Sequence, residues 1–179
     1  MTFNIHIYIV LNRLCRDLLV TGGLPAEKMS IKPNFVEAGD GPGIGPRSGG
    51  IFIGRLSPEK GIATLAAAMQ RLTGMQIEVY GSGPLQPLVE RSLGLRYCGF
   101  QQGAALRERL QRASYVVIPS TGIEAFGLVA IEAFACGTPV IASGQGGLRE
   151  IITHGQDGLL VSAGDPEALA AAIGFAEQH

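Results

Sequence analysis

The sequence predicts an α/β fold: a doubly wound parallel sheet of about six strands with helices on both faces. Short apolar runs bounded by glycine or proline alternate with helical patterns from residue 49 onward. The runs are mostly β-branched, aromatic or rich in leucine, as expected for parallel strands that are buried on both faces. The chain has 179 residues, of which 46% are hydrophobic, enough for one domain with a sizeable core.

The predicted elements follow one another from residue 51 to the end. The period of apolar residues predicts helices over residues 62–72 and 169–176. Ser57-Pro58 and Asp165-Pro166 are typical helix starts, each an N-cap residue followed by proline. The candidate strands are Ile51–Ile53, Ile77–Tyr80, Leu95–Cys98, Tyr115–Ile118, Val140–Ala142 and Leu159–Val161.

The first 50 residues are organised differently. Residues 39–50 hold glycine or proline at eight of twelve positions, which predicts a loop. Within the preceding residues 1–38, a helix is expected over Arg13–Val20 and a short extended segment over Lys32–Val36. Residues 1–12 fit no element well.

Composition excludes several classes of protein. With 14 basic and 15 acidic residues, bulk charge suggests neither a nucleic-acid nor an anionic-membrane partner. Three widely spaced cysteines without a C-x-x-C pair favour neither a disulfide scaffold nor a zinc site, and indicate a reducing compartment. The longest apolar stretches are too short to span a bilayer, and arginines follow rather than precede residues 5–11, unlike a signal peptide. We therefore expect a cytoplasmic protein without a transmembrane segment or metal.

Glycine recurs where the predicted strands end. Clusters begin at Gly54, Gly81, Gly99, Ser120 and Ser143, each just after a strand. Ligands bind at this edge of open α/β sheets, and glycine lets them approach the backbone closely. Any single glycine is better explained by the needs of a tight turn, but five clusters on one edge favour a binding site.

Two cations follow the first strand. If Ser57 caps a helix, Lys60 lies at its third position, where a cation opposes the helix dipole. An anion bound between the helix N-terminus, Arg55 and Lys60 would remove that conflict. Alternatively, Lys60 is solvated and paired with Glu59 or another acid. The spacing alone does not decide between the two.

Glu124 and Glu132 flank the start of an apolar helix expected from about Gly127. That helix should be buried, so Glu132 needs a partner: either ribose hydroxyls or an arginine. Glu124 lies just before the helix, either as a favourable charge at its N-terminus or as a carboxylate aimed at the hydroxyls of a small polar ligand. The N–H groups of Phe126, Gly127 and Leu128 would then face phosphate oxygens.

Other catalytic patterns are absent. The sequence contains no G-x-G-x-x-G, no P-loop, no H-E-x-x-H and no G-x-S-x-G. The three histidines, His6, His154 and His179, lie near no evident acid or nucleophile in the sequence and are interpreted as non-functional.

Several runs, in this order and spacing, resemble the C-terminal, nucleotide-sugar-binding domain of retaining glycosyltransferases with the GT-B fold, of the group 1 or family 4 type. The most specific is the E-x7-E element from Glu124 to Glu132, which continues to Ser143. The resemblance covers roughly Arg13 to the end and implies one Rossmann-like half of a GT-B fold. The other matching runs are 54–61, 80–85, 98–100, 119–120, 146–151 and 157–161.

The resemblance implies transfer of a sugar from a nucleotide diphosphate donor with retention, without a metal or other cofactor. Arg55 and Lys60 match the pair that neutralises the donor pyrophosphate. Glu124 matches the glutamate that contacts the donor sugar, and Glu132 the one that binds the ribose. Further donor contacts are expected from Gly54, Gly81, Gly83, Phe100, Phe126, Gly127 and Leu128.

The resemblance also implies that the N-terminal half of the GT-B fold is missing. The family has an N-terminal acceptor-binding domain, and residues 24–35 resemble the hinge that follows it, whereas residues 1–12 do not resemble what usually precedes that hinge. We therefore interpret 1–38 as a remnant of the preceding domain with its hinge, and 51–179 as the donor domain. The chain alone should bind nucleotide but transfer sugar poorly or not at all. In the full-length context it is expected to be peripheral at the inner membrane face.

Three alternatives stay open. The chain could be a non-catalytic nucleotide or nucleotide-sugar module that acts with a partner chain. It could be another GT-B relative, an epimerase or a phosphorylase, although no lysine is placed for the pyridoxal phosphate of a phosphorylase. It could be an NAD-dependent oxidoreductase, against which the missing G-x-G-x-x-G counts.

Overall fold

The computed structural model describes residues 5–37, 39 and 41–178. Its main feature is a six-stranded, all-parallel sheet in the order β5-β4-β3-β6-β7-β8. The predicted fold class is confirmed, and each strand begins and ends within one residue of its predicted bounds. The strands are β3 (Gly50–Ile53), β4 (Ile77–Tyr80), β5 (Leu95–Tyr97), β6 (Tyr115–Ile118), β7 (Val140–Ser143) and β8 (Gly158–Val161).

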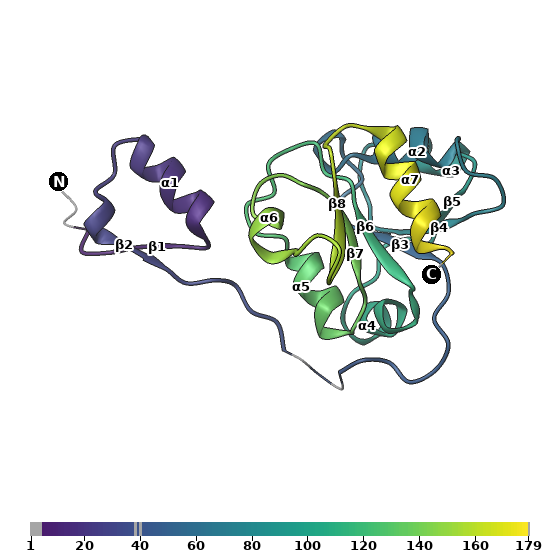
Figure 1. Ribbon diagram of the computed structural model, residues 1–179, viewed down its shortest axis with the longest axis horizontal. Helices are drawn as coiled ribbons and strands as arrows, with labels where there is room; N and C mark the ends of the chain where they lie inside the picture. The colour runs from purple at the N-terminus through teal and green to yellow at the C-terminus, as the bar shows by residue number, and fades with distance from the viewer. Residues whose placement is uncertain (1–4, 38, 40, 179) are drawn as a thin grey trace.

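Helices cover both faces of the sheet (Figure 1). One face carries α2 (Ile62–Met69), α3 (Gln86–Arg91) and α7 (Pro166–Ala176). The other carries α4 (Gly103–Arg112), α5 (Leu128–Ala135) and α6 (Leu148–Ile151). Successive strand residues point to opposite faces, so Ile51 packs under the second helix layer and Phe52 under the first.

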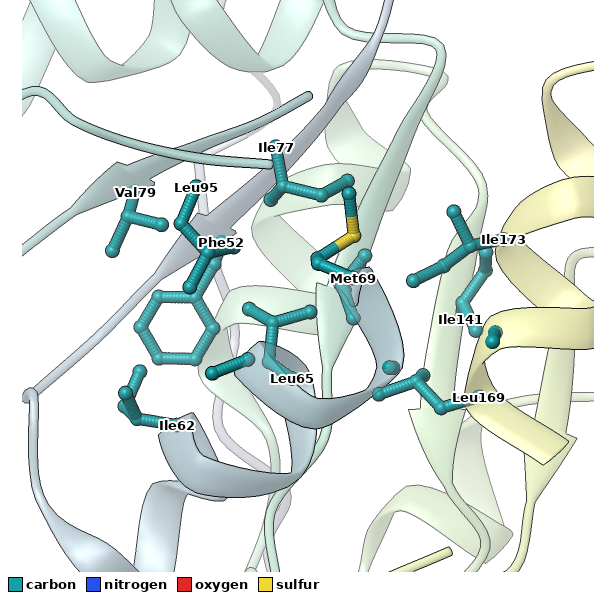
Figure 2. Close-up of a cluster of buried hydrophobic side chains, with 14 of the residues drawn as sticks. Phe52, Ile62, Leu65, Met69, Ile77, Val79, Leu95, Ile141, Leu169 and Ile173 are labelled. Carbon is teal, nitrogen blue, oxygen red and sulfur yellow. The ribbon is translucent and has the colours of Figure 1, made fainter. Parts of the chain in front are cut away.

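The larger core cluster lies beneath α2 and α7. Figure 2 shows Leu65 and Met69 of α2 facing the strands, with Leu169 and Ile173 of α7 beside them. All four side chains are essentially fully buried. Burying one such side chain stabilises the fold by about 1.5–3 kcal/mol.

One of the two predicted helix starts is confirmed. Asp165 caps α7, with its Oδ1 accepting hydrogen bonds of 3.0 Å from the N–H groups of Glu167 and Ala168. The prediction for Ser57 is wrong, because its hydroxyl instead donates to Glu59 Oε1 at 2.6 Å. Pro58–Lys60 form a separate 3-10 turn, η2, and α2 begins only after Gly61. Lys60 is therefore the last residue of that turn and not the third residue of an α-helix.

A small unit precedes the main sheet, which we call the N-terminal unit. It consists of β1 (Tyr8–Val10), α1 (Arg13–Thr21), η1 (Ala26–Lys28) and β2 (Met29–Ile31), and its two strands pair in parallel. The helix was predicted, but both strands were missed, and the segment expected to be extended lies just after β2. The N-terminal end of α1 faces α6 (Figure 1). No helix among the described residues is long and apolar enough to cross a membrane.

The glycine- and proline-rich segment is a loop, as predicted, over residue 39 and residues 41–49. Positions 1–4, 38 and 40 of the predicted N-terminal segments lie outside the described residues. Arg47 fastens the end of this loop, since its guanidinium donates to Ala113 O, Cys136 O and Thr138 Oγ1 at 2.5–3.0 Å. The loop therefore enters β3 from a fixed point.

Candidate functional site

The strand order reverses between β3 and β6. From β3 the chain moves outward to β4 and β5, and from β6 it moves the other way to β7 and β8. Such a switch point leaves a crevice at the carboxyl ends of the two central strands. A cavity of about 340 Å³ lies there, bounded by residues after β3 and after β6. Six of the predicted site residues line it: Gly54, Lys60, Glu124, Phe126, Gly127 and Leu128.

An ion pair crosses this crevice. Lys60 Nζ lies 2.7 Å from Glu124 Oε2, and the Ser120 hydroxyl donates to the same oxygen at 3.3 Å. The lysine and glutamate side chains are 33% and 20% exposed. Lys60 is thus paired with an acid, but with Glu124 and not with Glu59. An anion entering the cavity can compete with Glu124 for this ammonium group.

Gly61 brings Lys60 to the crevice. Its φ of +73° suits glycine, and a Cβ there would lie 1.8 Å from Pro119 O. The η2 turn is also bonded to the segment after β6, because Glu59 O accepts from the N–H groups of Thr121 and Gly122, both at 2.9 Å. These contacts hold Lys60 beside Ser120.

The loop before α5 presents backbone donors to the same cavity. Glu124 O accepts from Gly147 N at 2.7 Å, which holds the start of the loop. Gly127 has a φ of +99°, and a Cβ there would meet Leu148 Cδ2 at 2.7 Å. The N–H groups of Phe126, Gly127 and Leu128 donate to no other described residue. They are therefore free to bind an anion at the positive end of the helix.

A second cavity of about 420 Å³ adjoins the first, since Ile53 and Gly54 line both. Arg55, Gly81 and Phe100 line it as well, and the Phe100 ring is 66% exposed. This cavity extends the crevice towards β4 and β5.

Packing accounts for the glycines at 81 and 83. A Cβ at Gly81 would lie 1.8 Å from Gly54 O, and one at Gly83 would lie 2.5 Å from Leu56 O. The turns after β3 and β4 run side by side, with Leu56 N donating to Ser82 O at 2.9 Å. Gly81 lines the second cavity, whereas Gly83 lines none of the cavities described here. The simpler explanation, that these turns need glycine, therefore suffices for Gly83.

Glu132 is not in the crevice with Glu124. It lines a third cavity of about 640 Å³, with Glu37 and Arg107, which meets the second cavity at Leu106. Burial raises the pKa of Glu132, and the Arg107 guanidinium partly opposes that rise. Among the described residues no hydrogen bond or ion pair to the Glu132 carboxylate is formed.

The prediction that the helix carrying Glu132 is buried is largely wrong. Only Ala130 and Ala133 of α5 are fully buried, and Leu128 is exposed. The reason is that one side of α5 packs on the sheet while the other borders the first and third cavities. Partial exposure is what makes the unpaired Glu132 tolerable.

The family model described as glycosyl transferases group 1 matches residues 48–177. The chain belongs to this family. A glycosyltransferase of Methanocaldococcus jannaschii is 39% identical over 67% of this chain and 33% of its own length, and glycogen synthase of Mycobacterium tuberculosis is 37% identical over 72% and 34%. The Anabaena protein HepE, solved with UDP, superposes with a TM-score of 0.85 at 23% identity, over 97% of this chain and 54% of its own. This chain thus spans about a third of the curated relatives and half of the solved neighbour.

Three polar residues at the site of this glycosyltransferase domain were not among the predicted site residues, although Ser120 began one of the clusters found after the strands. Ser120 lines the first cavity, and the Gln145 amide fixes the segment behind it by donating to Ser120 O at 2.8 Å and Gly122 O at 2.9 Å. Gln101 lines the second cavity, and its Oε1 is buried without a hydrogen-bond partner among the described residues. Gln101 also follows closely after a predicted strand, a signal that could have identified it.

His154, interpreted from the sequence as non-functional, lies in the segment before β8 and lines none of the three cavities. Its Nδ1 accepts a hydrogen bond of 3.0 Å from Leu160 N in the turn before β8. Within the described part of the domain, no group of three or more histidine, cysteine, aspartate or glutamate side chains is arranged to hold a metal ion.

Proposed function

We propose that this chain is the donor-binding half of a glycosyltransferase, which binds a nucleotide diphosphate sugar for retaining, metal-independent transfer. The observation that carries the proposal is the meeting of Lys60, Glu124 and the unbonded N–H groups before α5 in one crevice at the switch point. One cation, one carboxylate and a helix N-terminus are what a phosphorylated sugar requires.

Binding begins with exchange of partners at Lys60. The donor pyrophosphate takes the place of Glu124 beside the ammonium group and accepts from the N–H groups of Gly127 and Leu128. Arg55, exposed at the rim of the second cavity, is free to swing onto the same phosphates. The released Glu124 carboxylate then accepts hydrogen bonds from hydroxyls of the donor sugar.

The same groups assist bond breaking. As the bond between the anomeric carbon and the phosphate oxygen breaks, negative charge grows on the departing nucleotide diphosphate. Lys60, Arg55 and the helix N-terminus stabilise that charge, which is the part a metal ion plays in other transferases. Glu132, about one helical turn along α5, binds the ribose where the second and third cavities meet. HepE, solved with UDP and with UDP-glucose, supports a nucleotide sugar as the ligand.

The acceptor half is proposed to lie outside residues 51–179. In the N-terminal unit, Ile7 and Ile9 are exposed, and β1 pairs with no described strand except β2. Residues 1–38 would then be the end of an acceptor domain and its hinge, supplied either in a longer chain or by a partner chain. Without that domain we expect little transfer. The proposed location is cytoplasmic, with peripheral attachment at the inner membrane face in the complete enzyme.

Calorimetric titration with UDP, GDP and ADP tests the donor site. We expect one nucleotide to bind, with affinity reduced by Lys60→Ala and by Glu132→Ala. Arg71→Ala is the control, because Arg71 lies just after α2, is exposed, and its side chain bonds among the described residues only to Ala67 O. If none of the three nucleotides binds, the proposal is refuted. Transfer activity that appears only after an acceptor-domain protein is added would distinguish the enzyme from a binding module that never transfers sugar.

A further inference from the structure

The loop between β6 and α5 depends on the N-terminal unit. Residues 119–127 have no regular secondary structure, so their carbonyl groups need partners elsewhere. Glu124 O is satisfied from within the domain, by Gly147 N. Ala125 O instead accepts from Asn12 Nδ2 at 2.6 Å, across 113 positions of sequence. The next residues along the loop carry the free N–H groups of the crevice.

Asn12 is buried, and both ends of its side-chain amide form hydrogen bonds. The residue is only 6% exposed, and its Oδ1 caps α1 by accepting a hydrogen bond from Cys15 N at 2.9 Å. The amide thus accepts on one side and donates on the other. Of the good N-cap residues, aspartate could replace the acceptor but not the donor, because an ionised carboxylate only accepts.

The junction around Asn12 is tightly packed. A Cβ on Gly147 would lie 2.6 Å from both Ala125 O and Asn12 Nδ2. The backbone of Gly147, with φ of −64° and ψ of −20°, suits any residue, so space rather than conformation requires glycine there. Beside it, Glu150 accepts from the N–H groups of Arg13 and Leu14 at 3.1 and 2.8 Å. The Cys15 thiol also donates to Ala125 O, at 3.7 Å, so four hydrogen bonds join the N-terminal unit to the loop before α5 and to α6.

The N-terminal unit also contributes to the wall of the crevice. Leu11, next to Asn12, and Asn34, just after β2, line the same cavity as Lys60 and Glu124. Displacement of the unit would thus open one side of the cavity as well as release Ala125 O.

We propose that Asn12 is a positioning residue for the phosphate site. Through Ala125 it holds the N–H groups of Phe126, Gly127 and Leu128 towards the cavity, which couples docking of the N-terminal unit to phosphate binding. The role of the loop in phosphate binding rests on the proposed function, whereas its positioning by Asn12 does not. Because coupling is reciprocal, a bound nucleotide diphosphate holds the N-terminal unit more firmly in turn.

Asn12→Asp tests this directly, because it keeps the cap on α1 but sets an oxygen against Ala125 O. We expect UDP to bind about tenfold more weakly or worse, the cost of losing one hydrogen bond in a charged site, while uridine affinity is unchanged. Without ligand, amide hydrogen exchange of residues 124–128 should be faster than in the wild type. If the wild type prefers GDP or ADP, that nucleotide and its nucleoside are used.

Two further variants make the test specific. Gly147→Ala leaves Asn12 in place but crowds its contact with Ala125, and should reproduce the loss of UDP affinity. Asp17→Asn, at an exposed position of α1 whose only side-chain partner among the described residues is Arg16, should change nothing.

Unchanged UDP affinity and unchanged loop exchange in Asn12→Asp would overturn the proposal. Equal weakening of UDP and uridine, with faster exchange throughout the domain, would also overturn it, since that pattern is general destabilisation. If the wild type binds no nucleotide, the proposed function fails separately, and loop exchange alone decides the role of Asn12. Faster exchange would then support positioning, and unchanged exchange would refute it.

Discussion

The main domain and the N-terminal unit both contain helices and parallel strands, but the domain is held together by a buried core and the unit by contacts with the domain. The domain buries both faces of its sheet, and its largest side chains are fully covered. The N-terminal unit has a helix with no buried residue and a two-stranded sheet whose Ile9 and Ile31 are exposed. A two-stranded sheet is marginal by itself, so the unit is held in place largely by its junction with the domain. The ordered position of the N-terminal unit therefore depends on Asn12 and Glu150 more than on a core of its own.

Truncating a leucine in each region should show the largest contrast. Leu65→Ala, in the core under α2, is expected to lower the free energy of unfolding by about 2–5 kcal/mol, through lost burial and a cavity. Leu18→Ala, in α1 and 54% exposed, should cost about 0.5 kcal/mol or less. Urea denaturation measures both, and equal losses would show that the N-terminal unit has a core of its own.

A matched pair of glycines gives the next contrast. Gly61 and Gly23 have φ of +73° and +94°, but a Cβ at Gly61 meets Pro119 O whereas one at Gly23 has nothing within 4 Å. Gly61→Ala should cost about 3 kcal/mol or more, from strain together with collision, and should weaken nucleotide binding by displacing Lys60. Gly23→Ala carries the strain alone, about 1–2 kcal/mol, and should leave binding intact. Melting curves with and without UDP test both, and a loss of binding in Gly23→Ala would contradict this account.

Removal of the α7 cap should have a smaller effect that stays within the domain. Asp165→Ala removes the acceptor for Glu167 N and Ala168 N, at a cost of about 1 kcal/mol. Amide exchange in the first turn of α7 should become faster while that of residues 13–21 stays the same. Faster exchange in both places would mean that the two regions unfold together.

The smallest effect concerns pH. Burial raises the pKa of Glu132 above its usual 4.5, so the fold favours the protonated carboxyl. That contribution to stability is complete below pH 4.5 and is lost as pH rises through the raised pKa. Glu132→Gln should therefore stabilise the protein at pH 7, by about 0.5 kcal/mol or less, and the gain should vanish below pH 4.5. Thermal melting from pH 4 to 8 checks this, and a loss of stability at pH 7 would contradict it.

The sequence predicted the main sheet well because its strands are short, mostly apolar and bounded on at least one side by glycine or proline. It missed β1 and β2 because, unlike the equally short β5 that follows Gly94, neither strand directly adjoins a glycine or proline, so each is recognisable only from its partner, here through pairs such as Tyr8 with Met29. It also misplaced the start of α2, because the Ser57-Pro58 signal marks a 3-10 turn that Gly61 ends. A local pattern such as Ser57-Pro58 shows that a helical turn begins, but not whether that turn continues directly into the following α-helix.

For the candidate site, too, the sequence identified some residues but not the contacts between them. Residue types at strand ends identified Lys60 and Glu124, but their ion pair spans 64 positions and depends on how η2 packs against the end of β6. The burial of α5 was overestimated because composition does not reveal that one side of it borders open cavities. The contact of Asn12 with Ala125 was likewise beyond the sequence, since nothing local marks a partner 113 positions away.

The segment that joins the N-terminal unit to the main domain spans a shorter distance than its number of residues would allow. Besides Arg47, the side chains of Gln111 and Arg107 bond to Gly41 O and Glu37 O at 2.8 and 3.4 Å, which lays the segment along α4. Even with all these bonds broken except those of Arg47, the roughly ten residues back to Val36 would span only about 17 Å on average. The N-terminal unit then acts as an intramolecular ligand at millimolar effective concentration. A junction of four hydrogen bonds, too weak to join separate molecules, can for that reason remain formed most of the time.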